Sequence, residues 1–112
     1  MRLLLVGCSH HTASVAVRER LAFDASQAEQ ALSSLRARFP TTEAVLLSTC
    51  NRVELYTAAL DPHGGPTHHE AATFLAEFHG LDAGELFDEL FERTGEDAVR
   101  HLFTVASSLD SM

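Results

Sequence analysis

The chain contains no lysine: all eight of its basic residues are arginines, and they stand against sixteen acidic residues for a formal net charge of −8. Binding to nucleic acid in general depends on Lys and Arg side chains that neutralise phosphates. The arginines here are scattered from Arg2 to Arg100 without a basic stripe. The composition therefore argues against general nucleic-acid affinity. An RNA substrate would have to be bound mainly elsewhere, or by shape and a few local arginines.

Other features are equally scarce. Two cysteines, Cys8 and Cys50, are too few for a disulfide scaffold. The purely apolar runs, such as Leu3–Val6, are too short to span a bilayer, and the first residues show no signal-peptide cleavage site. No Gly-x-Gly-x-x-Gly or P-loop pattern offers a home to a dinucleotide or triphosphate. These absences predict a cytoplasmic protein without membrane association, and 112 residues with 46% apolar content fit one globular domain.

The pattern of apolar residues predicts alternating strands and helices. Asp24 and Gln27 form a capping-box pattern at the start of one helix, which Pro40 ends. The stretch 86–93 is ambiguous, because its apolar residues fit a helix while Thr94-Gly95 could end a short strand. The predicted strands are 2–9, 43–48 and 53–59, and the predicted helices are 15–23, 25–39, 67–80 and 96–107. This order predicts an α/β (α+β) fold: a split βαβ, ferredoxin-like sheet covered by helices.

Cys50 stands where one predicted strand ends and the next begins, within Ser48-Thr49-Cys50-Asn51-Arg52. A strand end can project a thiol into a cleft, and a nearby cation favours the nucleophilic thiolate. Free cysteine is also among the most buried residue types, so Cys50 could equally be a small core residue. Its polar neighbours favour a site.

Three further groups could carry chemistry. His10 follows the first strand and could line the same cleft as Cys50, or the turn there could merely satisfy backbone donors. His101 could reach Cys50 as a Cys-His pair or could be a boundary residue of the last helix. Arg18-Glu19 is interpreted as a solvated surface pair. The spacing of Cys8, His10, His11 and Cys50 does not match paired zinc knuckles, so no metal site is predicted, and His63, His68 and His69 are expected to be exposed.

The order of three motifs resembles the catalytic domain of glutamyl-tRNA reductases. The first motif is Gly7–Ala13 followed by Arg18-Glu19, and the second is Ser48–Tyr56. The third joins His101–Phe103, Val105-Ala106 and Leu109–Met112. These motifs spread over essentially the whole chain, and the Ser-Thr-Cys-Asn-Arg segment is the most specific.

The resemblance implies the first step of five-carbon tetrapyrrole (porphyrin) synthesis. A cysteine thiolate attacks glutamyl-tRNA to give a thioester, which NADPH reduces to glutamate-1-semialdehyde. Carried over by motif, Cys50 and His101 are catalytic residues. The implied substrate-binding residues are His10, Thr49, Asn51, Arg52 and Ser111, with Arg52 the partner of the glutamate carboxylate. Glutamyl-tRNA is the implied substrate, the full-length family is homodimeric, and a downstream aminomutase is a further implied partner.

Two positions depart from the family pattern: Ser14 stands where Pro is common, and Ser108 where Gly is usual. Residues 1–112 are expected to be the N-terminal catalytic domain of a longer chain, without the NADPH-binding and dimerisation domains. Such a domain would form the thioester but not reduce it. Two other functions stay open from the residues alone: a non-catalytic small-molecule-binding module with a buried Cys50, and a general Cys-His hydrolase.

Overall fold

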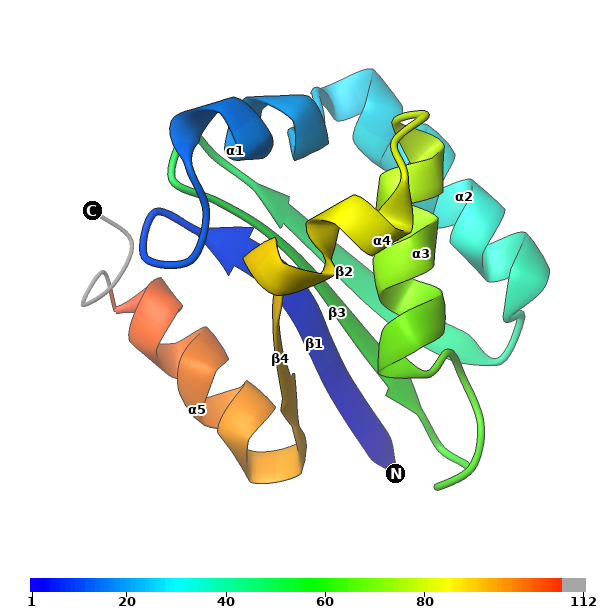
Figure 1. Cartoon of the computed structure of the whole chain (residues 1–112). Coiled ribbons are helices and arrows are strands. Elements are labelled where there is room, and N and C mark those ends of the chain that lie inside the picture. The colour runs from blue at the N-terminus through cyan, green and yellow to red at the C-terminus, as the bar shows by residue number, and fades with distance from the viewer. Residues whose placement is uncertain (108–112) are drawn as a thin grey trace.

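The computed structural model describes residues 1–107, which form a four-stranded antiparallel sheet and five α-helices (Figure 1). The strands are β1 (Arg2–Ser9), β2 (Thr42–Ser48), β3 (Arg52–Ala59) and β4 (Phe91–Thr94). The helices are α1 (Val15–Leu21), α2 (Ala25–Arg38), α3 (His68–Phe78), α4 (Ala83–Leu86) and α5 (Gly95–Ala106), and the short 3₁₀ turn η1 (Phe87–Glu89) precedes β4. The predicted α+β class is confirmed. The predictions made for Ser108 and Ser111 lie outside the described residues.

The strand order in the sheet is β2-β3-β1-β4, and every neighbouring pair is antiparallel. β1 is therefore a central strand, paired along its whole length with β3 and over Leu4–Gly7 with β4. β2 and β3 follow each other in the chain and form an antiparallel hairpin. The ambiguous stretch 86–93 divides into the end of α4, the turn η1 and most of β4.

Two helices begin with capping boxes, and the sequence predicts the one at Asp24. The Asp24 carboxylate accepts a hydrogen bond from the Gln27 backbone at 2.7 Å, and the Gln27 side chain accepts one from the Asp24 backbone at 2.9 Å. Thr67 and Glu70 make the same reciprocal pair at the start of α3. Each box satisfies backbone N–H groups that have no partner within the helix. Helix α2 ends at Arg38, ahead of Pro40, because the residue before proline avoids helical geometry.

Ser14 caps α1. Its side chain accepts a hydrogen bond from the Val17 backbone at 3.3 Å, and its φ is −67°. That φ is the value to which a proline ring is confined, so serine and proline fit the same backbone here. The departure from the family pattern at this position therefore leaves the helix entry intact and adds a cap.

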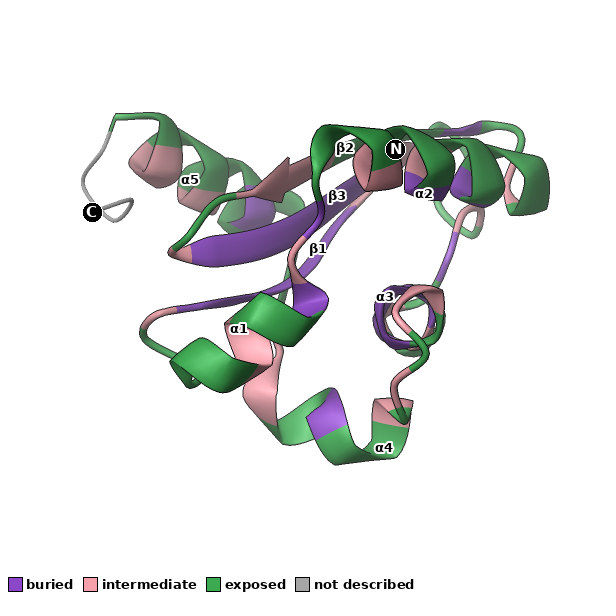
Figure 2. Cartoon of the chain, turned by 90° about the horizontal axis from the view of Figure 1, so that it is seen from above, coloured by how far each residue is buried: buried purple, intermediate pink, exposed green. Residues whose placement is uncertain are grey.

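The main core lies between one face of the sheet and helices α1 to α4. The β1 side chains Leu4, Val6 and Cys8 point to this face, since alternate residues of a strand share a face. They pack with buried residues from the helices, among them Leu21 of α1 and Leu35 of α2. Figure 2 shows buried residues concentrated on β1 and β3 and on the inner sides of these helices.

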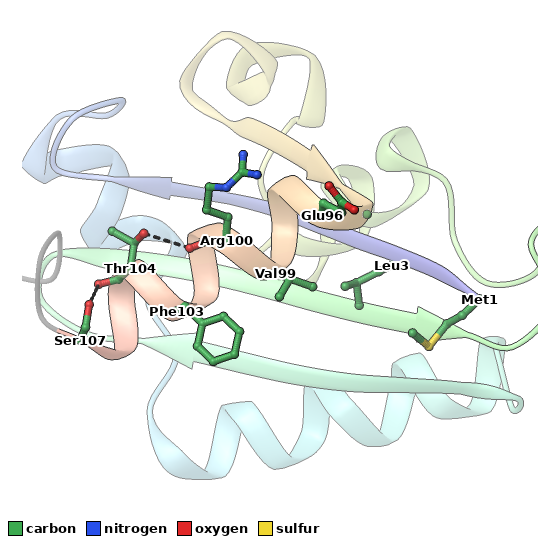
Figure 3. Close-up of a pocket in the computed structure, with 9 residues that line it drawn as sticks. Met1, Leu3, Glu96, Val99, Arg100, Phe103, Thr104 and Ser107 are labelled. Carbon is green, nitrogen blue, oxygen red and sulfur yellow. Dashed lines mark hydrogen bonds between the residues drawn. The ribbon is translucent and has the colours of Figure 1, made fainter.

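On the opposite face of the sheet, α5 is the helix that packs against the strands among residues 1–107. Leu5, Tyr56 and Ala98 form a second, smaller cluster there. The apolar stripe predicted on the last helix does exist, but it is exposed: Val99, Leu102 and Phe103 are 39%, 40% and 69% exposed. With Leu3 and Met1, the side chains of Val99 and Phe103 line an open apolar groove along α5 (Figure 3). No helix in the described part of the chain is long and apolar enough to cross a membrane.

Candidate active site

Three strand ends meet at one edge of the molecule, as the sequence predicts. Ser9, the last residue of β1, pairs with Arg52, the first residue of β3. The backbone N–H of His10 donates to the carbonyl of Asn51 at 2.9 Å. The turn after β1 is therefore bonded directly to the β2–β3 hairpin, and it brings His10 beside the segment that carries Cys50.

Cys50 lies at the tip of the β2–β3 hairpin. The Thr49 N–H donates to the Arg52 carbonyl at 2.8 Å, and the Thr49 hydroxyl oxygen accepts from the Asn51 N–H at 3.1 Å. Only Cys50 and Asn51 remain between these bonded ends, so the loop is short and its backbone is constrained. Cys50 is exposed. Its interpretation as a small core residue is wrong.

Arg18 holds the same loop from the side of α1. Its Nη1 donates to the Cys50 carbonyl at 2.8 Å. Interpreting Arg18-Glu19 as a solvated surface pair was therefore wrong for Arg18, whose side chain binds the backbone of the candidate nucleophile. A charge-assisted hydrogen bond of this kind is worth more than a surface ion pair. Position 18 in the sequence gives no signal of this contact, because 32 residues separate the partners.

The second cysteine has the opposite environment. Cys8 is fully buried in the main core, on the face of β1 turned toward the helices. Burial raises the pKa of the Cys8 thiol to about 11, since a thiolate there would lose its hydration. Cys8 is therefore held as the unreactive thiol at neutral pH, and Cys50 is the accessible sulfur.

A buried carboxylate, Glu54, organises the face of β3 behind the hairpin. Its Oε2 accepts from the Arg52 guanidinium at 2.8 Å and lies 2.7 Å from Nε2 of His101, while its Oε1 accepts from the Tyr56 hydroxyl at 2.8 Å. Arg52 and Glu54 are 1% and 0% exposed. Sequence reasoning assigned no role to Glu54 or Tyr56. Their spacing from Arg52 was the available signal, because residues i, i+2 and i+4 of a strand share one face.

The glycine opposite Glu54 makes room for this arrangement. Gly7 pairs with Glu54 in the sheet, and a Cβ at Gly7 would lie 2.4 Å from the Val53 carbonyl oxygen and 2.9 Å from the Glu54 Cα. Tyr56 completes the group as a neutral phenol. Burial, followed by its hydrogen bond to Glu54 and the charge of that carboxylate, raises the Tyr56 pKa far above its usual value.

His101 reaches this group from α5, 47 residues along the chain from Glu54. Its ring also packs against Phe91, with centroids 5.2 Å apart. Among the described residues, the His101 ring is hydrogen-bonded to Glu54 and not to Cys50. The direct Cys-His pair that the sequence suggested is therefore not formed in this structure. His10 stacks on His11 with ring centroids 3.9 Å apart, and among the described residues its buried Nδ1 has no hydrogen-bond partner.

The remaining histidines lie elsewhere. His63 and His69 are exposed, as expected, whereas His68 is half-buried with its Nδ1 3.4 Å from the Glu92 carboxylate. Within residues 1–107, no three His, Cys, Asp or Glu side chains are placed together so that they could hold a metal ion.

The described residues do not fit a nicotinamide dinucleotide. That group is held where a glycine-rich turn joins a strand of a parallel sheet to the N-terminus of a helix, which supports the pyrophosphate. Here β1 leads through Ser9–Ser14 into the seven-residue α1, and residues 8–14 contain no glycine. All strand pairs of this sheet are antiparallel.

The comparisons with known proteins agree with the motifs. A family model described as "Glutamyl-tRNAGlu reductase, N-terminal domain" matches residues 6–112. The chain belongs to this family. A glutamyl-tRNA reductase from Syntrophotalea carbinolica and one from Geobacter metallireducens are each 47% identical to it over 112 residues. The solved structure of glutamyl-tRNA reductase from Methanopyrus kandleri matches 98% of this chain with a TM-score of 0.66 and 33% identity.

The match covers only part of the related glutamyl-tRNA reductases. This chain spans 25% of the two bacterial relatives and 23% of the Methanopyrus chain. The three motifs noted in the sequence all fall in this shared N-terminal domain. In this domain of a glutamyl-tRNA reductase, the hairpin tip with Cys50 and the buried group around Glu54 form the candidate active site.

Proposed function

We propose that this chain carries out the acyl-transfer step of a glutamyl-tRNA reductase, with Cys50 as the nucleophile. The observation that carries the proposal is the exposed Cys50 on a constrained hairpin tip. Bonds from Arg18, His10 and Thr49 hold the backbone around it. A nucleophile whose backbone is fixed in advance loses little further freedom on reaching the reactive geometry.

The proposed step is the exchange of an ester for a thioester. The Cys50 thiolate attacks the carbonyl carbon of the glutamyl ester, and a C–S bond forms as the bond between that carbon and the terminal ribose oxygen breaks. The ribose oxygen leaves with a proton as a free hydroxyl of the tRNA. No oxidation or reduction occurs in this exchange. The product keeps the activated carbonyl, which a free carboxylate would not offer to a hydride.

Substrate positioning is proposed for the residues around the hairpin. Arg52 is the proposed partner of the glutamate side-chain carboxylate, since a guanidinium keeps its positive charge and carries further N–H donors besides the one that Glu54 accepts. Thr49, Asn51 and His10 lie on or against the hairpin and are proposed to contact the substrate. The buried Nδ1 of His10 is a polar atom suited to that role. Ser111, the remaining proposed contact, is outside the described residues.

Reduction of the thioester is assigned to parts of the protein that the relatives have beyond this domain. Because the described residues do not fit NADPH, hydride transfer is assigned to those other parts as well. NADPH dependence, a homodimeric full-length protein, transfer of product to an aminomutase and cytoplasmic location belong to the same proposal. We also infer the split βαβ, ferredoxin-like class, because the order β2-β3-β1-β4 interleaves two βαβ units.

The alternatives make different predictions. A non-catalytic module with a buried, unreactive Cys50 is disfavoured because Cys50 is exposed. A general Cys-His hydrolase would turn over many activated esters without preference. A glutamyl-tRNA reductase domain should instead prefer glutamyl esters, because a buried arginine close to the hairpin recognises the second carboxylate.

The test is the intact mass of this chain after mixing with glutamyl-tRNA or an activated ester of glutamate. We expect one glutamyl adduct that is labile to hydroxylamine, present in Cys8→Ser and absent in Cys50→Ser. The corresponding glutamine ester, which lacks the charge, should react much more slowly. An adduct that survives in Cys50→Ser, or equal rates with the two esters, would contradict the proposed function.

A further inference from the structure

Burying the Glu54 carboxylate in this position costs free energy. A carboxylate that is 0% exposed on a central strand gives up its hydration, and buried ion pairs are often no more stabilising than apolar residues of similar volume. The fold also reserves Gly7 opposite it, where any side chain would collide with the β3 backbone. Stability alone therefore gives little reason for this carboxylate.

The contacts of Glu54 do fix the proton on His101. Its Oε2 accepts a hydrogen bond from the permanently charged Arg52, and a carboxyl oxygen without a proton can only accept hydrogen bonds. The His101 Nε2 at 2.7 Å must therefore donate, so it carries the proton. In the neutral ring, Nδ1 is then the basic nitrogen.

Glu54 fixes the two neighbouring groups at once. One oxygen, Oε2, binds both Arg52 and His101, so a single atom holds the guanidinium and the imidazole. The other oxygen is held by the hydroxyl of Tyr56, which prevents the carboxylate from rotating. The distances of 2.7 to 2.8 Å are those of charge-assisted hydrogen bonds.

We propose that Glu54 is the positioning residue of this site: it sets the Nε2–H tautomer of His101, leaves Nδ1 as the nitrogen that exchanges protons, and orients Arg52. This inference deepens the proposed acyl transfer and rests on it for the consequence to reactivity. The tautomer itself is a property of the folded chain and does not depend on that function.

The first measurement is ¹⁵N NMR of the imidazole of His101 in the unmodified 112-residue chain. Couplings from the ring carbon protons to the two nitrogens identify the protonated one. We expect Nε2–H in the neutral ring, and a mixture of tautomers in Glu54→Gln. The matched control is Glu43→Gln, the same substitution at an exposed position of β2, which should leave the His101 spectrum unchanged.

The second measurement is the pH dependence of Cys50 acylation by an activated glutamate ester. Loss of a charge-assisted hydrogen bond should slow acylation in Glu54→Gln by about ten- to a hundredfold, and it should change the shape of the pH profile, whereas a merely structural loss leaves that shape intact. Glu43→Gln should match the unmodified chain in both rate and profile.

The outcomes are separable. An Nδ1–H tautomer in the unmodified chain overturns the proposal without any variant, so a Glu54→Gln chain that failed to fold would not protect it. An unchanged tautomer and profile in a folded Glu54→Gln would also overturn it. Absence of acylation in every chain, with the Nε2–H tautomer observed, would reject the proposed function and keep the assignment of the proton on His101.

Discussion

At the scale of single residues, the two cysteines differ in their access to solvent. Cys8 is enclosed by the main core and its pKa is raised to about 11 by burial, whereas Cys50 is exposed at a hairpin tip. Alkylating reagents attack the thiolate and need access to it. In the folded chain, a labelling reagent should therefore modify Cys50 and leave Cys8 unmodified.

We expect iodoacetamide at pH 8 to add one label to the folded chain, on Cys50, and a second only after denaturation. Intact mass followed by peptide mapping gives the number and position of the labels. Cys50→Ser should take up no label while folded, and Cys8→Ser should take up one label while folded and no second label after denaturation. Labelling of Cys8 in the folded chain at a rate similar to Cys50 would show that the core around β1 opens readily.

Sequence reasoning found the residues whose chemistry is local and missed those whose role depends on contacts. The residue types of Cys50 and its polar neighbours were enough to predict a site there. Arg18 and Glu54 did not, because the Arg18 contact spans 32 residues and the Glu54–His101 contact spans 47. An isolated charged residue in an apolar strand is ambiguous until the partner from another element is known.

At the scale of elements, β1 and β3 approach each other closely at Gly7. Its substitution by alanine would place a Cβ 2.4 Å from the Val53 carbonyl oxygen, so the strands must separate. We expect Gly7→Ala to lower the free energy of unfolding by about 2–3 kcal/mol, as overpacking of a rigid core does. Urea unfolding monitored by circular dichroism measures the change.

A matched control for this prediction is Gly84→Ala in α4. There the nearest atom to an added Cβ is the Asp82 Oδ1 at 3.5 Å, an ordinary contact, and alanine favours helix over glycine. Its unfolding free energy should stay the same or rise by less than about 1 kcal/mol. Equal effects of the two substitutions would mean that the close approach at Gly7 is not what matters.

The boundaries of elements were predictable where the signal lay within the element. The capping box at Asp24 and the strand at β1 needed only neighbouring residues, and both are confirmed. For β4 the sequence left helix and short strand open, since its four residues are mostly exposed and are held by pairing with β1. The stripe on α5 could be predicted, but its exposure could not, because amphipathic pattern alone does not say which surface a helix meets.

At the scale of the whole molecule, the raised pKa of Cys8 makes stability depend on pH in the alkaline range. The unfolded thiol ionises near its ordinary value of 9.0, while the folded thiol keeps its proton up to about 11. The contribution of Cys8 to the free energy of unfolding is therefore fully present below pH 9. It is lost as pH rises from 9 to 11, by roughly 2–3 kcal/mol in total. The raised pKa of Tyr56 acts in the same direction above its ordinary value of 10.0.

Urea unfolding at intervals from pH 8 to pH 11 measures this loss. We expect Cys8→Ala to be less stable at pH 8, because it leaves a small cavity, yet to lose less stability than the unmodified chain between pH 9 and pH 11. The comparison uses the slope with pH rather than the absolute stability. Parallel slopes for the two chains would show that Cys8 does not carry the alkaline dependence.

The central position of β1 has a consequence for how the chain is made. The ribosome synthesises this strand before its partners, since Leu4 pairs with Thr57 on one side and with Thr94 on the other. The β2–β3 hairpin joins neighbouring segments and can close soon after it leaves the exit tunnel. The loop that carries Cys50 is thus expected to take shape before the sheet that supports it, while the apolar first strand waits unpaired and open to chaperones.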